Sequence, residues 1–310
     1  MSVHTFRRRV AVPMATIVMT LILGSLLVGC APKPAGETGT EIVEASEVGS
    51  LLEQPNAVLV DTRPMPEYRE RHVSGAVNVS RADIVVLEPF PNMVAPREQI
   101  ERVLGSRGID NDSLVIAYDD NNNMDAARLW WTLKAYGHHE VKVVSGGLNA
   151  LEEERFSVDS SSPEIDETTF NAEPLNEEMI VTAPEIRRYL DEPDPSVVLV
   201  DTRSEEEHLE GHIPGSIHID YLENNFPDGT FRPVNHLRII YLEEGIDYEK
   251  EVLLYCETSI RGAQSYLAMY NAGYRNLRLY DGAWVEWSAN PMNQVHVPES
   301  DTPLRAPDQS

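Results

Sequence analysis

The chain is poor in cysteine and in lysine. It has two cysteines, Cys30 and Cys256, and four lysines among 310 residues. Acidic residues outnumber basic ones by 51 to 25, so the formal net charge is −26. Nucleic acid is polyanionic, so a chain with this balance is not expected to bind it. Two cysteines allow at most one internal disulfide, and a thiol left without a partner is a candidate reactive group.

The N-terminus reads as an export signal that ends at Cys30. Three arginines (residues 7–9) precede an apolar run (residues 10–29), and Cys30 follows directly. This pattern resembles the lipobox of bacterial lipoproteins, which implies that residues 1–29 are removed and that Cys30 is lipidated. The protein would then be held on a membrane of the cell envelope, facing outside the cytoplasm, with residues 30–40 as a flexible tether. The alternative is a plain membrane-spanning anchor, since the run approaches the roughly 20 apolar residues that a bilayer requires.

The rest of the chain contains an internal repeat. Residues 58–63 and 198–203 both read Val-Leu-Val-Asp-Thr-Arg, and ten of 22 positions from Val58 and Val198 onward are identical. Two later segments correspond in the same order, residues 115–118 with 252–255 and residues 137–146 with 273–282. Three landmarks in one order indicate a duplicated domain, and the chain length also suggests about two domains.

Within each copy, short apolar runs alternate with helical patterns. The runs are residues 57–60, 114–118 and 141–144, then 197–200, 252–255 and 277–280, and the clearest helices are residues 125–136 and 262–272. This rhythm predicts an α/β fold with a mostly parallel sheet in each copy, flanked by helices. We expect the first domain at residues 41–155, a surface linker at 156–176, the second domain at 177–296 and a disordered tail at 297–310.

Cys256 lies where a predicted strand meets a predicted helix. The strand end is expected to expose the sulfur in a polar turn, and backbone N–H groups there can stabilise a thiolate. Arg261 adds a permanent charge for anion binding, although it could equally pair with a surface carboxylate. Thr258 and Ser259 can offer hydroxyl donors, and one of them is expected to cap the helix. The first copy has Asp119 in place of the cysteine, so we expect it to be catalytically silent.

With these residues in view, the chain resembles tandem rhodanese-domain sulfurtransferases of the thiosulfate or 3-mercaptopyruvate type. The resemblance covers about residues 41–296 and rests on residues 201–203 and 211–216, the cysteine loop and residues 280–287. It implies a double displacement in which Cys256 takes sulfur from a small donor, becomes a persulfide and passes the sulfur to a thiol or to cyanide. It implies neither a metal nor another cofactor. Substrate binding would fall to Arg261, Thr258, Ser259 and Arg203, although the recurrence of Asp201-Thr-Arg203 in the silent copy favours a structural ion pair.

Two departures from the thiosulfate pattern bear on the donor. Glu257 follows the cysteine where basic residues are common, and Glu207 stands where a second substrate arginine is common. A carboxylate beside the sulfur repels a dianion unless it points outward. A tethered persulfide carrier or sensor without small-molecule turnover therefore stays open, as does a structural lipoprotein with an inert Cys256. Cysteine phosphatases need arginine one position later, where this chain has Gly262.

Overall fold

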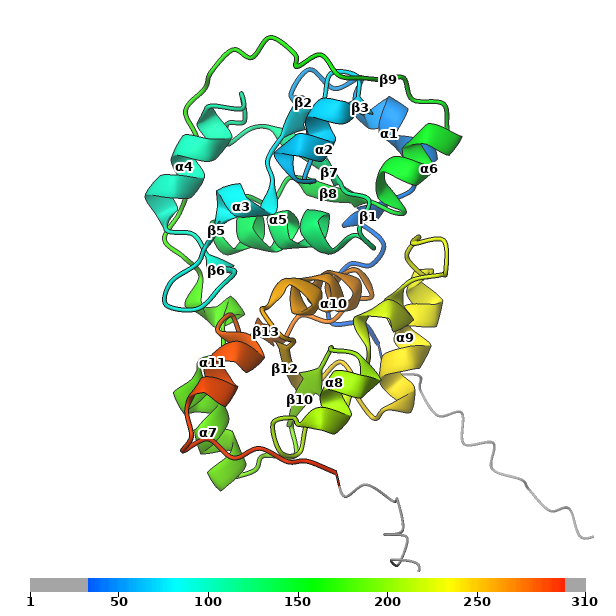
Figure 1. Cartoon of the computed structure of the whole chain (residues 1–310). Coiled ribbons are helices and arrows are strands. Elements are labelled where there is room, and N and C mark those ends of the chain that lie inside the picture. Colours follow the sequence, from blue (N-terminus) through cyan, green and yellow to red (C-terminus); the bar gives the residue numbers. More distant parts are fainter. Residues whose placement is uncertain (1–32, 299–310) are drawn as a thin grey trace, which may run out of the picture. The chain divides into compact units, whose positions relative to one another are not determined.

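Two parallel β-sheets organise residues 33–298, the part of the chain that the computed structural model describes. The sheet of the first domain has the order β1-β8-β7-β2-β4, and that of the second domain has the order β11-β10-β12-β13 (Figure 1). All neighbouring strands in these two sheets run parallel. The predicted α/β class with two similar domains is therefore confirmed. The predicted signal, the lipidation site Cys30 and residues 299–310 of the predicted tail lie outside the described residues.

The elements follow the predicted alternation of strand and helix. The strands are β1 (Ile42–Val43), β2 (Ala57–Asp61), β3 (His72–Val73), β4 (Val77–Asn78), β5 (Val85–Val86), β6 (Met93–Val94), β7 (Leu114–Tyr118), β8 (Val141–Val144), β9 (Val158–Asp159), β10 (Val197–Asp201), β11 (Ile217–His218), β12 (Glu251–Tyr255) and β13 (Leu277–Leu279). The α-helices are α1 (Ala45–Leu51), α2 (Met65–Glu70), α3 (Arg81–Ile84), α4 (Arg97–Gly105), α5 (Met124–Ala135), α6 (Gly147–Glu153), α7 (Ala183–Asp191), α8 (Glu205–Glu210), α9 (Val234–Glu243), α10 (Ile260–Asn271) and α11 (Ala283–Ala289). Two 3-10 helices complete the set, η1 (Glu177–Met179) and η2 (Tyr221–Asn224). The six predicted strands coincide with β2, β7, β8, β10, β12 and β13 to within one residue at each end.

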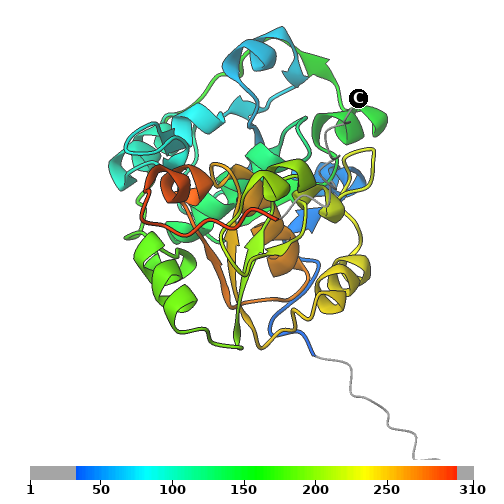
Figure 2. The ribbon, with the colours of Figure 1, turned by 60° about the horizontal axis from the view of Figure 1, so that its bottom comes forward.

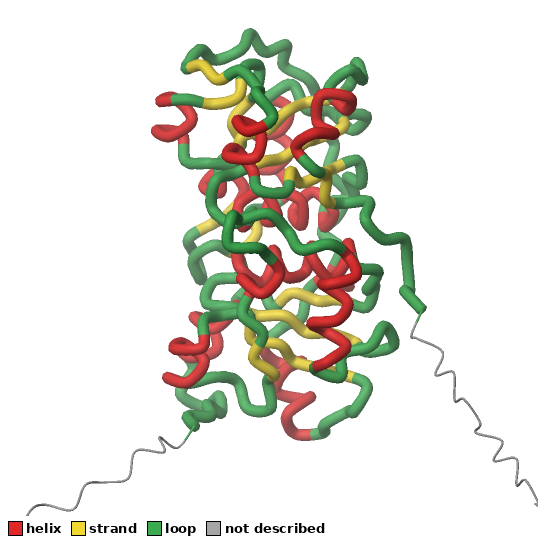
Figure 3. The backbone as a smooth tube through the Cα atoms, turned by 90° about the vertical axis from the view of Figure 1, so that its right-hand side faces the viewer, coloured by secondary structure: helices red, strands yellow, loops and turns green. Residues whose placement is uncertain are grey.

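Helices cover both faces of each sheet because successive strand side chains point to opposite sides. In β12, Val252 and Leu254 face the apolar cluster that includes α9 and α10, whereas Leu253 and Tyr255 face the cluster that includes α7 and α11. Figure 2 shows α7 and α9 on opposite sides of this sheet, and Figure 3 shows strands between helices in both domains. The near-continuous apolar runs predicted strands that are buried on both faces, and the strands of the structure are packed in this way.

The two domains share one apolar cluster along α5 and α10. Trp130 of α5 lies with its ring centroid 5.3 Å from that of Tyr270 and 6.1 Å from that of Tyr266, both on α10. Such aromatic pairs contribute about 0.5–1.5 kcal/mol each beyond the area that they bury. The first domain is therefore packed directly on the helix that begins at the cysteine loop.

Residues 35–40, predicted as part of a flexible tether, are instead docked on the second domain. The N–H of Ala35 donates to the carbonyl of Gly273 at 3.0 Å, and the N–H of Gly39 donates to the carbonyl of Asn271 at 2.9 Å. Asn271 is the last residue of α10, so this segment binds the carbonyl end of that helix. This part of the prediction is wrong because the helix end offers backbone acceptors that the composition of the segment did not reveal.

Residues 160–176 connect the domains without a helix or strand and lie against the first domain. The N–H of Thr168 donates to the carbonyl of Gly105 at 2.9 Å, and Phe170 is 2% exposed in the apolar core. Among residues 33–298, no helix combines the length and the apolar character needed to cross a membrane.

Candidate active site

Cys256 follows the last residue of β12 and is almost fully enclosed. Tyr255 pairs with Asp201 of β10, and its carbonyl accepts the N–H of Thr202 at 2.9 Å. The carbonyl of Cys256 accepts the N–H of Trp284 at 2.9 Å, which ties the cysteine to the start of α11. The residue is 1% exposed, so the expectation that its sulfur is exposed is wrong. In the turn that follows, Glu257 and Thr258 are partly exposed, whereas Ser259 is buried and bonds to the first domain.

The equivalent loop of the first domain holds a carboxylate where the cysteine would be. Asp119 follows Tyr118 at the end of β7. The carbonyl of Tyr118 accepts the N–H of Thr62, just as the carbonyl of Tyr255 accepts the N–H of Thr202 in the second domain. The Asp119 carboxylate accepts backbone N–H groups of four residues at 2.8 to 3.0 Å, namely Asn121, Asn123, Asp125 and Ala126. The backbone after the strand therefore gathers its N–H groups on an anion at this position.

Burial and the charge of the neighbouring Asp125 raise the pKa of Asp119 to about 6, against the opposing effect of the backbone N–H groups of Ala126, Asn121 and Asp125. The carboxylate is 1% exposed. Because the Asp119 carboxylate already accepts these N–H groups, they are not available to another anion.

The two loops share their form but differ by one residue in length. Helix α5 begins at Met124, five residues after Asp119, whereas α10 begins at Ile260, four residues after Cys256. Each helix is preceded by a residue in the left-handed region, Asn123 with φ of 63° and Ser259 with φ of 67°. The N–H groups that open α10 are thus available to a negative charge on or next to the Cys256 sulfur.

Arg261 is held by a carboxylate of its own domain. Its Nη1 donates to Glu207 Oε2 at 2.5 Å and its Nη2 donates to Oε1 at 2.7 Å, which is a two-pronged ion pair. This pair lowers the pKa of Glu207 to about 2. Of the two predicted roles for Arg261, the structure shows pairing with a carboxylate, and that carboxylate is one of the two unusual glutamates.

Arg203 forms the expected ion pair with Asp201 beneath the loop. Its Nη2 donates to Asp201 Oδ2 and to the carbonyl of Gly211, both at 2.7 Å, and both charged side chains are nearly fully buried. Burial works to raise the pKa of Asp201, but the bonds and charge of Arg203 outweigh it and hold that pKa below its usual value. Arg63 binds Asp61 in the same way in the first domain. Because the same ion pair occurs in both domains, it belongs to the fold that they share. Arg203 also borders a cavity.

That cavity has a volume of about 390 Å³ and adjoins the cysteine loop. Its lining is Arg203, Glu207, Glu210, Gly211, Glu257 and Trp284. The Arg203 guanidinium lies over the Trp284 ring at 4.3 Å, and its Nη1 is 3.8 Å from Glu257 Oε2. Burial raises the pKa of Glu257, since Arg203 offsets it only in part and Glu207 adds to it. Glu207 is paired with Arg261 and Arg203 with Asp201, so Glu210 and Glu257 leave this approach to the loop negatively charged.

Thr258 and Ser259 both face the first domain. Thr258 Oγ1 accepts the Nδ2–H of Asn92 at 2.9 Å, and Ser259 Oγ donates to the carbonyl of Asn92 at 3.4 Å. Ser259 occupies the N-cap position of α10, but its side chain makes no capping hydrogen bond. The expected hydroxyl cap is therefore absent from this helix, and both hydroxyls bond to Asn92 in the loop between β5 and β6 instead.

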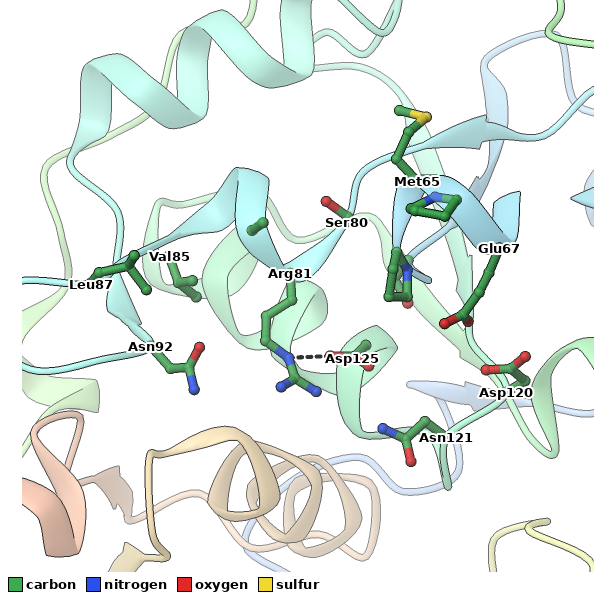
Figure 4. A pocket seen from close by; sticks show the side chains of 14 residues that line it. Met65, Glu67, Ser80, Arg81, Val85, Leu87, Asn92, Asp120, Asn121 and Asp125 are labelled. Carbon is green, nitrogen blue, oxygen red and sulfur yellow. Dashed lines mark hydrogen bonds and ion pairs between the residues drawn. The ribbon is translucent and has the colours of Figure 1, made fainter. Parts of the chain in front are cut away.

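A second cavity, of about 630 Å³, lies on the first domain and is bordered by Asn92 (Figure 4). Arg81 of α3 donates its Nε–H to Asp125 Oδ1 at 2.5 Å across this cavity. Asp125 is the second residue of α5, as Arg261 is of α10. The second residue of this helix is thus acidic in the first domain and basic in the second, and each is paired with a residue of opposite charge from its own domain.

The rhodanese-like domain family matches the chain twice, over residues 44–154 and 182–290. The chain belongs to the rhodanese-like family. A protein of Mycolicibacterium smegmatis named as a thiosulfate sulfurtransferase is 31% identical over 271 residues, which cover 80% of this chain and 94% of that protein. The 3-mercaptopyruvate sulfurtransferase of Escherichia coli is 26% identical over 275 residues, covering 81% and 95%. The crystal structure of SseA from Escherichia coli superposes with a TM-score of 0.72 at 24% identity, covering 80% of this chain and 99% of that chain, which supports the rhodanese fold.

Sequence reasoning missed the residues with which the first rhodanese domain contacts the cysteine loop. Asn92 is separated from Thr258 by 166 residues, and Arg128 from its ion-pair partner Asp281 by 153. No local motif links such distant positions. The one signal was Asp281 itself, which lies in the segment 280–287 that carried part of the family resemblance.

Proposed function

We propose that this protein is a sulfurtransferase that carries sulfur as a persulfide on Cys256 in its second rhodanese domain. The observation that carries the proposal is Asp119. At the equivalent position of the silent domain, four backbone N–H groups converge on its carboxylate. An anionic terminal sulfur bonded to Cys256 has a similar reach from the main chain and the same sign of charge. The loop is thereby suited to hold a persulfide anion.

The reaction consists of two displacements at sulfur. In the first, the Cys256 thiolate attacks the outer sulfur of the donor, and the electron pair of the broken bond leaves with the rest of the donor. In the second, a thiolate or cyanide attacks the terminal sulfur of the persulfide, and the electron pair of the sulfur–sulfur bond returns to Cys256. The enzyme is unchanged overall, so the cycle requires no further oxidant or reductant.

We further propose that the donor carries less negative charge than thiosulfate. Arg261, which would attract an anion, is neutralised by Glu207 in a bond of 2.5 Å, and Arg203 is committed to Asp201. Glu207, Glu210 and Glu257 line the adjoining cavity. A dianion meets repulsion there, whereas 3-mercaptopyruvate, with one carboxylate, meets about half as much.

Two variants test the assignment of the active domain. Cys256→Ser should abolish transfer of sulfur to cyanide from either donor, and Asp119→Ala should retain it. Transfer by the serine variant at the wild-type rate would contradict the proposal. A wild-type protein that takes up no sulfur from small donors, yet becomes a persulfide when mixed with a persulfidated protein, would favour the carrier alternative. Two observations support the carrier alternative, namely that Cys256 is buried and that glutamates line the adjoining cavity.

We also propose, on the sequence alone, that Cys30 is lipidated and holds the enzyme on the outer side of a cell-envelope membrane. Labelling of the full-length chain with a fatty-acid probe in a bacterial host tests this. The label should be lost in Cys30→Ala and kept in Cys256→Ser. Equal labelling of the Cys30→Ala variant would refute the anchor without bearing on sulfur transfer.

A further inference from the structure

The cavity of about 630 Å³ in the first domain lies beyond the carboxyl ends of three parallel strands. Its lining includes Thr62, which follows β2, Ser80, two residues after β4, and Asp120, two residues after β7. Open α/β sheets bind ligands beyond this edge. Cavities that hold small organic molecules have volumes of about 300–1,000 Å³. This first-domain cavity therefore has the size and the place of a ligand site.

One end of the first-domain cavity is apolar. Val85 and Leu87 line this end, and Figure 4 shows them well apart from Glu67 and Asp120 at the other end. Leu87 is 74% exposed, although it is a large apolar side chain. Covering such a side chain with an apolar group removes its surface from water and is favourable. A ligand with an apolar part gains free energy at this end.

The other end carries carboxylates that the protein leaves partly without partners. Asp120 is paired with Arg63 at 3.2 Å, and Asp125 Oδ1 accepts from Arg81. The Asp125 side chain is only 7% exposed, yet its second oxygen accepts no hydrogen bond from any residue between 33 and 298. Within the same range, the Glu67 carboxylate forms neither a hydrogen bond nor an ion pair. Two acceptors on the cavity wall are therefore available to a cation.

The second domain shows which cation suits this place. Glu207 is the third residue of α8, as Glu67 is of α2. Arg261 is the second residue of α10, as Asp125 is of α5. In the second domain, the guanidinium of Arg261 donates to both oxygens of Glu207, at 2.5 and 2.7 Å. The first domain thus has the glutamate of this pair, but a carboxylate stands where the guanidinium would begin.

We propose that the first-domain cavity binds a small organic guanidinium compound with an apolar substituent. Its guanidinium takes the place beside Glu67 that Arg261 takes beside Glu207. A monosubstituted guanidinium has five N–H donors in one plane, so it can bind the Glu67 carboxylate with two of them and offer others to Asp125 Oδ2. The substituent extends toward Leu87. This binding makes and breaks no covalent bond, and it goes beyond the proposed sulfur transfer because it does not use Cys256.

Isothermal titration calorimetry of the full-length chain with 2-phenylethylguanidinium tests the proposal. The wild type should bind one molecule per chain. 2-Phenylethylamine has the same apolar group, but its ammonium cannot form the two-pronged bond in one plane, so it should bind about tenfold more weakly. The anion 3-phenylpropanoate should not bind, because the carboxylates of the cavity repel it.

Four variants locate the site. Glu67→Gln should weaken binding of 2-phenylethylguanidinium about tenfold or more, since it removes the charge that the guanidinium pairs with. Glu70→Gln removes an exposed charge from the same helix outside the cavity lining and should bind as the wild type does. Leu87→Ser should weaken 2-phenylethylguanidinium about threefold to tenfold and leave methylguanidinium, which lacks the apolar group, unchanged. Cys256→Ser should bind 2-phenylethylguanidinium with the affinity of the wild type.

Three results would overturn the assignment. One is a wild-type chain that shows no saturable binding of 2-phenylethylguanidinium at millimolar concentration. Another is equal affinity for this compound in Glu67→Gln and the wild type. The third is loss of binding in Cys256→Ser, which would place the compound at the cysteine loop instead. Uptake of sulfur by the wild type is measured separately by intact mass, so failure of this binding and failure of the persulfide function are told apart.

Discussion

Replacing Glu207 with glutamine should make the enzyme a better thiosulfate sulfurtransferase. The carboxylate lies within 2.5 Å of Arg261 and borders the cavity beside the cysteine loop. For a dianion about 8 Å away in a partly exposed site with an effective dielectric constant of about 40, the repulsion from one charge is roughly 2 kcal/mol. Removing it should raise kcat/KM for thiosulfate about 30-fold. For 3-mercaptopyruvate, with one charged carboxylate, the same estimate gives roughly 1 kcal/mol and about fivefold.

The assay compares the two donors, with cyanide as the acceptor, for the wild type and Glu207→Gln. Because Arg261 lowers the pKa of Glu207 to about 2, the carboxylate is charged throughout the usual assay range, and the gain should not vary with pH between about 5 and 8. The matched control is Glu67→Gln at the equivalent position of the first domain, which should change neither donor's rate. Equal gains for both donors, or none for thiosulfate, would refute the charge argument.

Three further predictions concern stability. Asp281→Asn leaves the buried Arg128 charge without its partner and should lower the free energy of unfolding by about 3–5 kcal/mol in urea titrations. As a control, Arg81→Gln at a partly exposed ion pair should lower it by about 1 kcal/mol or less. Similar losses for the two variants would contradict the role of burial. Asp119→Ala leaves several buried N–H groups without an acceptor and should lower the free energy of unfolding by about 1–3 kcal/mol. An unchanged unfolding midpoint would count against the loop geometry. The folded-state pKa of Glu207 is about 2, below its ordinary value of 4.5, so its contribution is present above pH 4.5 and is lost as the pH falls toward 2. Glu207→Gln should flatten that acid loss, and an identical stability profile for both proteins would contradict the pairing with Arg261.

The sequence was sufficient for the parts of the fold that repeat or alternate. Apolar runs bounded by polar turns located the principal strands, and the duplicated Asp-Thr-Arg motif predicted the ion pair that Arg203 forms with Asp201. The sequence also showed that Cys256 of the second copy corresponds to Asp119 of the first. These features depend on neighbours in the sequence or on direct comparison of the two copies.

The enclosure of the site depends on contacts across the two domains, which no local pattern describes. Cys256 was expected at an exposed loop, but its 1% exposure arises from packing by distant segments. The roles of Thr258 and Ser259 were open because helix capping and substrate binding favour the same residue types. Only the position of Asn92, on the other domain, separates the two hydroxyls.

The central claim is that Cys256 carries sulfur as a persulfide, and the intact mass of a soluble chain beginning after Cys30 tests it most directly. After incubation with 3-mercaptopyruvate or thiosulfate, the wild type should gain the mass of one sulfur atom, lose it on addition of cyanide, and gain more from 3-mercaptopyruvate at equal concentration. Cys256→Ser should gain nothing. A wild-type mass that does not change with either donor, or a gain of sulfur that persists in Cys256→Ser, would contradict the account.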